Sequence, residues 1–157
     1  MIKRFYFIVP LCLIAVSLCV AAPLQEQAQP DKPQAKTLKV TVSYSGKGEV
    51  DQGHGIYMFL FDSPDFVQSP GSVMPVSFRA IHSNGEAATF DGLTAENVYL
   101  AVAFDQEGGY DMQGPPPSGT PVAVYKPGEA QLPTPIKLEV GKDIEIKFSF
   151  DDSLRMP

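Results

Sequence analysis

Cysteine, histidine and tryptophan are scarce in this chain. It has 157 residues with two cysteines, two histidines and no tryptophan. His54 and His82 have no second His or Cys at the spacing of a zinc motif, so a zinc site is not expected. Both fall in turns or at a strand end, where we expect exposed loop residues. Both cysteines, Cys12 and Cys19, lie in the N-terminal apolar run, which leaves the rest of the chain without thiols or disulfides.

Signatures of catalysis and of phosphate binding are also missing. Ser118 lacks the flanking glycines of a nucleophile elbow. The turn Gly46-Lys47-Gly48 is too short to cradle a phosphate. Carboxylate pairs such as Asp62/Asp65 and Asp151/Asp152 are ordinary at strand ends of an acidic domain. The sequence therefore predicts no enzyme and no organic cofactor.

The N-terminus predicts export. Lys3 and Arg4 precede an apolar run, 5–22, that ends in small residues, which is the pattern of a secretory signal peptide over residues 1–22. Cleavage after Ala22 leaves Pro23 first, which is disfavoured, and cleavage after Ala21 avoids this. Two alternatives remain open: a lipoprotein modified at Cys19, although Leu18 is bulky for that motif, and an uncleaved membrane anchor. All three place the domain in the periplasm or outside the cell.

The charge balance is acidic. The formal net charge is −6, and removing Lys3 and Arg4 leaves 10 basic against 18 acidic residues, a net charge of −8. Such a surface repels nucleic acid and anionic lipid. We expect no nucleic-acid partner, and contact with a membrane only through Cys19 or an uncleaved N-terminus.

Residues 23–36 (PLQEQAQPDKPQAK) are polar and rich in proline and glutamine, which predicts a flexible linker. From residue 37 to 157 the apolar residues repeat with a period of two between glycine and proline turns. The sequence predicts an all-β, antiparallel Greek-key β-sandwich of seven or eight short strands. The expected strands are 37–44, 56–61, 76–80, 87–90, 98–104, 122–125, 136–140 and 143–150.

Three strands show their faces most clearly. Leu38, Val40, Val42 and Tyr44 form the apolar side of the first strand. Val76, Phe78 and Ala80 alternate with Ser77 and Arg79 in the third. Ile144, Ile146, Phe148 and Phe150 face inward in the last strand, which we expect to be a core strand whose loss unfolds the domain.

One segment resembles a known family. Residues 88–93 (ATFDGL) followed by 98–105 (VYLAVAFD) are similar to carboxypeptidase regulatory-like domains, which are transthyretin-like β-sandwiches common in exported bacterial proteins. Asn97-Val98 stands where that family usually has glycine before the Tyr-bearing strand. The resemblance covers about a fifth of the chain and implies a sandwich fold with a binding, structural or accessory role.

The loop 105–120 is the first candidate site, because loops of this length are often functional. Asp105, Glu107 and Asp111 surround Gly108-Gly109, and carboxylates on a bendable backbone suit Ca²⁺. Their spacing is not that of an EF-hand. The alternative is a solvated acidic turn followed by a stiff Pro115–Pro117 segment.

The second candidate is the strand 56–61 (IYMFLF), which is apolar on both faces. Tyr57, Phe59 and Phe61 need cover, either from Ala101, Ala103 and the loop 63–75 or from an external partner. With Tyr110 they form the predicted partner-binding set. The sequence thus predicts a non-catalytic binding or accessory module for a protein or cell-envelope partner. The alternative is a Ca²⁺-dependent small-ligand or glycan binder that uses the 105–120 loop, although sugar sites typically contain exposed aromatics and the chain has no tryptophan.

Overall fold

The computed structural model describes residues 35–69, 71–128, 130 and 132–157. The predicted signal peptide, both cysteines and residues 23–34 of the predicted linker lie outside these residues. The described chain is all-β except for the four-residue 3-10 helix η1 (Pro64–Val67). Within this part of the chain no helix is long and apolar enough to cross a membrane.

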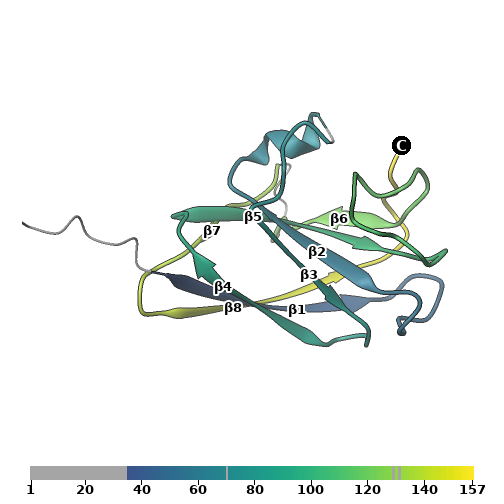
Figure 1. The fold of residues 1–157 in the computed structure, drawn as a ribbon, viewed down its shortest axis with the longest axis horizontal. Coiled ribbons are helices and arrows are strands. Elements are labelled where there is room, and N and C mark those ends of the chain that lie inside the picture. Colours follow the sequence, from purple (N-terminus) through teal and green to yellow (C-terminus); the bar gives the residue numbers. More distant parts are fainter. Residues whose placement is uncertain (1–34, 70, 129, 131) are drawn as a thin grey trace, which may run out of the picture. The chain divides into compact units, whose positions relative to one another are not determined.

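The strands form two sheets (Figure 1). They are β1 (Lys36–Tyr44), β2 (Ile56–Phe61), β3 (Ser77–Ile81), β4 (Ala87–Leu93), β5 (Asn97–Phe104), β6 (Val122–Val124), β7 (Ile136–Lys137) and β8 (Asp143–Phe150). One sheet has the order β4-β1-β8, and the other has the order β3-β2-β5-β6 with β7 also pairing β5. The first strand starts at Lys36, one residue before the predicted domain boundary.

The ladders are antiparallel except for the pairing of β1 with β8, which is parallel from Thr37↔Asp143 to Tyr44↔Phe150. The prediction of an entirely antiparallel sandwich is therefore wrong for this pair. The two strands run in the same direction because the chain enters β8 at the end of the sheet where β1 begins. Leu138 N donates to Glu96 O (2.8 Å) and Lys36 Nζ donates to Ala95 O (2.9 Å), so the chain before β8 runs past the end where β1 begins.

The core lies between the sheets. In β1 the predicted alternation is confirmed, because Leu38, Val40 and Val42 are fully buried. They pack with residues of the other sheet such as Met58 and Leu100 in one cluster. Each large apolar side chain removed from water in this way contributes about 1.5–3 kcal/mol, so the interface between the sheets is the main source of stability.

In β3 the apolar face points the other way from what the alternation suggested. Val76 and Phe78 are each 48 % exposed, while Ile81 is 2 % exposed and belongs to the core. Arg79 explains the reversal. Its guanidinium lies 5.3 Å from the centre of the Phe90 ring and donates from Nε to Thr89 O (2.9 Å), so a charged side chain closes this side of the sandwich.

In β8 the inward-facing set is only partly buried. Ile144, Ile146 and Phe148 are intermediate in exposure and Phe150 is buried, although all four pack against the core. The strand lies at the end of its sheet. β8 is therefore an edge strand whose four apolar side chains pack against the core, as predicted, while three of them stay partly exposed.

Candidate functional site

Tyr99 and five other aromatic side chains gather on the face of β2 that points away from the other sheet. Tyr57, Phe59 and Phe61 of β2 meet Phe66 of η1 and Tyr110 of the 105–120 loop, and we call this set the aromatic cluster. Phe66 stacks on Phe61, with ring centres 4.1 Å apart, and Tyr110 meets Tyr57 edge-on at 5.0 Å. Phe59 and Phe61 are each only 9 % exposed.

The cluster is covered by the chain's own loops. Ser63 accepts a hydrogen bond from Asp65 N (3.2 Å) and Pro64 is the first residue of η1, so the local sequence sets the turn that lowers Phe66 onto Phe61. Of the four residues predicted to bind a partner, Phe59 and Phe61 are thus buried and Tyr57 and Tyr110 are partly buried. Internal cover, one of the two readings of the sequence, is the arrangement observed.

The 105–120 loop is held down by Asp105. This side chain is 7 % exposed, and its Oδ2 accepts a hydrogen bond from Tyr110 N (2.8 Å). Tyr110 Oη in turn donates to Gly114 O (2.6 Å). Burial raises the pKa of the Tyr57 and Tyr110 hydroxyls, and the Asp105 charge adds to the rise at both.

The three carboxylates predicted to bind Ca²⁺ have different surroundings. Asp105 is buried, whereas Glu107 and Asp111 are exposed. Asp111 Oδ1 accepts from Gln113 N (3.1 Å), which closes a local turn. Across residues 35–157, leaving aside positions 70, 129 and 131, no three His, Cys, Asp or Glu side chains come together in an arrangement that could hold a metal ion.

A polar hollow lies where the 45–55 loop meets the start of the 105–120 loop. Its volume is about 320 Å³. It is lined by Gly48, Phe104 and five polar residues, which are Glu49, Asp51, His54, Gln106 and Glu107. Asp51 Oδ1 lies 2.9 Å from His54 Nδ1 and accepts from Gly53 N (2.8 Å). These contacts hold the pKa of Asp51 below its usual value, and the hydrogen bond from Gly53 N contributes most. The hollow contains an imidazole–carboxylate pair, but no hydroxyl, thiol or amine side chain is among its lining residues.

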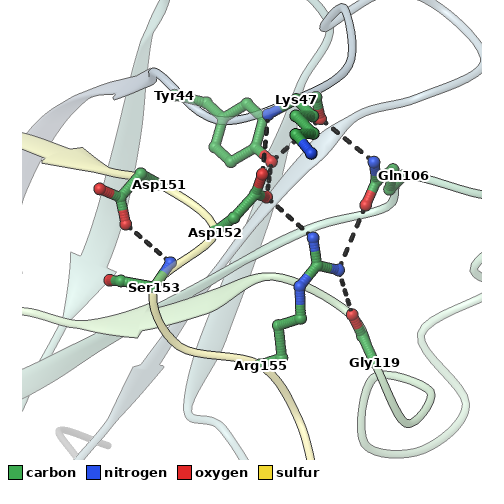
Figure 2. A network of polar contacts seen from close by, with 8 residues as sticks. All are labelled: Tyr44, Lys47, Gln106, Gly119, Asp151, Asp152, Ser153 and Arg155. Atoms are coloured by element: carbon green, nitrogen blue, oxygen red, sulfur yellow. Dashed lines mark hydrogen bonds and ion pairs between the residues drawn. The ribbon is translucent and has the colours of Figure 1, made fainter.

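A hydrogen-bonded network fixes the C-terminal segment beside this hollow (Figure 2). Tyr44 Oη donates to Asp152 Oδ1, and Lys47 N donates to Asp152 Oδ2 (2.9 Å). Arg155 bonds to Asp152, to Gln106 Oε1 (3.3 Å) and to Gly119 O (2.6 Å). The hydrogen bond from Tyr44 is the main cause that lowers the pKa of Asp152. Burial is the main cause that raises the pKa of Tyr44, and its hydrogen bond to Asp152 adds to the rise.

The sequence analysis treated Asp151/Asp152 as ordinary strand-end carboxylates. The two differ in the structure. Asp151 accepts from Ser153 N (2.8 Å) two residues away, whereas Asp152 joins the C-terminal segment to Tyr44 and Lys47 and also pairs with Arg155. The close packing of Gly46 belongs to the same network, since a Cβ there would come within 2.8 Å of Asp152 Cγ. No periodic pattern in the sequence marks these contacts.

The exposed counterpart of the aromatic cluster lies at the edge of the same sheet. Met74, Val76 and Phe78 are 77 %, 48 % and 48 % exposed, and we call them the β3 strip. Phe78 is the direct cross-strand partner of Phe59, so the strip continues the aromatic face of β2 past the cover of η1. The alternation of Val76 and Phe78 with Ser77 and Arg79 did not indicate which of the two faces is exposed. The signal that could have found it was Ile81, whose position in the strand favours burial of the Arg79 side.

Comparisons with protein-family models, with curated proteins and with solved structures gave no match for this chain.

Proposed function

We propose that this chain is an exported, non-catalytic binding or accessory module that engages a protein or cell-envelope partner through the β3 strip. The exposure of Met74, Val76 and Phe78 beside a covered aromatic cluster carries the proposal. Exposed apolar side chains that gather at one strand edge are typical of interaction sites. A partner that covers the β3 strip removes its apolar surface from water, as η1 does for Phe61, and this burial favours binding.

The acidic charge sets the chemistry of that partner. The net charge is −6 for the whole chain and −8 without Lys3 and Arg4. A surface of this charge favours neutral or basic partners and disfavours nucleic acid. We therefore propose a protein or envelope component that presents an apolar ridge with basic residues at its rim.

The proposal that the module is non-catalytic draws on the polar hollow. His54 and Asp51 form a pair of the kind that activates nucleophiles, yet the side chains lining the hollow offer none to activate. The pair instead shapes the 45–55 loop, where Asp51 N donates to His54 O (3.1 Å). We assign it a structural role.

We further propose that the chain is related to the carboxypeptidase regulatory-like domains and has Greek-key connections. Support comes from the segment that carries the resemblance. Phe90 and Leu93 are buried and Gly92 has a positive φ of 74°. The Tyr99-bearing β5 follows and ends one residue before the buried Asp105. Gly92 lies within β4, where the register with β1 shifts, and a glycine fits this position because L residues avoid positive φ.

The binding surface can be tested by photo-crosslinking in the cells that make the protein. A photoreactive phenylalanine analogue replaces Phe78 in one variant and Glu107, an exposed residue of the 105–120 loop, in the matched control. We expect a discrete adduct from position 78 and none from position 107. An adduct from position 107 alone would move the binding site to the loop and overturn the proposal.

Export is tested separately by cell fractionation and N-terminal sequencing. The proposal predicts a processed protein in the periplasm or medium that starts at Ala22 or Pro23. A protein starting at Cys19 in the membrane fraction would identify the lipoprotein alternative. An unprocessed protein in the cytoplasm would contradict export.

A further inference from the structure

The outer edge of β8 is an eight-residue strand edge that has no paired strand among the described residues. β8 (Asp143–Phe150) pairs along its whole length with β1 on one side and ends its sheet on the other. Among the described residues no backbone group pairs with that outer edge between residues 143 and 149. The strand contains no proline and its ladder with β1 has no bulge, so the edge is straight and open to another strand.

The edges of β3, β4 and β6 carry contacts of a kind that the outer edge of β8 lacks among the described residues. The Arg79 side chain donates to Phe78 O (2.8 Å) and to Thr89 O (2.9 Å), so it occupies edge carbonyls of both β3 and β4. Beside β6, Val122 N donates to Leu154 O (3.0 Å) and Met156 N donates to Thr120 O (2.9 Å). The C-terminal segment therefore covers that edge, and β6 itself is only three residues long.

We propose that β8 pairs with β8 of a second copy of this chain, antiparallel about a two-fold axis at Ile146, to form a weak homodimer. The register follows from the side chains. Residues directly opposite in an antiparallel pair share a face, so only registers centred on a residue keep the half-buried Ile144, Ile146 and Phe148 together.

Charge then selects among the registers. A two-fold axis at Ile146 sets Glu145 opposite Lys147 twice, and sets Ile144 opposite Phe148 twice. An axis at residue 145 or 147 sets like charges opposite each other, Glu against Glu or Lys against Lys. Like charges directly opposite destabilise a sheet and opposite charges stabilise it, so the strand is self-complementary in one register.

A second copy fits this edge better than the segment that precedes β1. Pro23, Pro30 and Pro33 of residues 23–36 have no N–H to donate to a ladder. A second β8, in contrast, supplies unbroken backbone donors and acceptors along the strand, the opposite charges, and apolar cover for Ile144 and Phe148. The pairing is isologous, as the commonest soluble dimers are. One strand pair is smaller than a standard interface of about 1,200–2,000 Å², which is why we expect the dimer to be weak.

The test is a charge swap measured by sedimentation equilibrium on the protein purified from the cells that make it, from roughly 10 µM to 1 mM. The wild type is expected to shift from monomer to dimer across this range. K147E sets Glu against Glu and E145K sets Lys against Lys, so each variant alone is expected to dimerise at least about tenfold more weakly. An equimolar mixture of the two restores opposite pairs and is expected to recover dimer as a heterodimer.

Melting curves at low concentration accompany the swap. They show whether each variant is folded, which matters for E145K because Glu145 also pairs with Lys39 (3.1 Å). A wild type that stays monomeric over the whole range overturns the proposal. Equal dimerisation of wild type, K147E and E145K overturns the assignment to β8. Neither result bears on the β3 strip, which lies in the other sheet and is tested by crosslinking at position 78.

Discussion

Replacing Phe66 with alanine tests whether the aromatic cluster is a second core held together by η1. Phe66 is 8 % exposed and stacks on Phe61 with ring centres 4.1 Å apart. Losing its burial costs about 1.5–3 kcal/mol, and losing the ring pair costs about 0.5–1.5 kcal/mol more. Because η1 is a short surface turn that can partly close the gap, we expect a loss near the middle of the sum, about 3 kcal/mol.

The assay is thermal unfolding of Phe66→Ala against the wild type. A loss of about 3 kcal/mol corresponds to a melting temperature lower by about 10 °C for a domain of this size. Val67→Ala is the matched control, since Val67 lies in the same turn but is 45 % exposed, and we expect it to cost less than about 0.5 kcal/mol. If Phe66→Ala melts within about 1 °C of the wild type, η1 does not hold the cluster and Phe59 and Phe61 are available to a partner after all.

Three further predictions follow from the loops and the sheet. Tyr44→Phe should lower the melting temperature most between about pH 4 and 10. The stabilising hydrogen bond is lost at low pH, as Asp152 is protonated through its lowered pKa, and its contribution falls above about pH 10, as the pH rises toward the raised pKa of Tyr44. A difference in melting temperature that does not change with pH would contradict this. Excess Ca²⁺ and EDTA should give the same melting temperature, because Asp105 Oδ2 already accepts from Tyr110 N and no three carboxylates of the described residues form a metal-holding group. A rise of several degrees in Ca²⁺ that Glu107→Ala abolishes would establish the metal site. A chain ended before Ile144 should lose its cooperative unfolding transition, since it lacks most of the eight-residue ladder to β1; a sharp calorimetric transition from that chain would refute this.

The period-two pattern predicted the strands well where one face is buried. Leu38, Val40 and Val42 occupy the core as the alternation of β1 indicates. The pattern did not show which face of β3 is buried. In β3 the side chain of Arg79 packs across Phe90, so Val76 and Phe78 point outward. Alternation shows which residues share a face, and tertiary contacts decide which face is buried.

The sites were harder to predict because they depend on contacts between distant segments. Phe61 and Phe66 are close in sequence, so cover of β2 by the loop 63–75 was foreseeable. Tyr44 and Asp152 are 108 residues apart, and nothing local marks their hydrogen bond. Asp105 is a predicted metal ligand because carboxylates and glycines surround it, and in the structure its Oδ2 accepts a backbone hydrogen bond within its own loop. Residue types alone do not distinguish these two uses of a carboxylate.

The claim that the β3 strip is the binding surface is tested most directly by hydrogen exchange on the protein with and without the partner captured at position 78. The account predicts that the partner slows exchange in residues 74–81 and leaves residues 105–120 unchanged. Slower exchange confined to residues 105–120 would contradict it and assign binding to the loop.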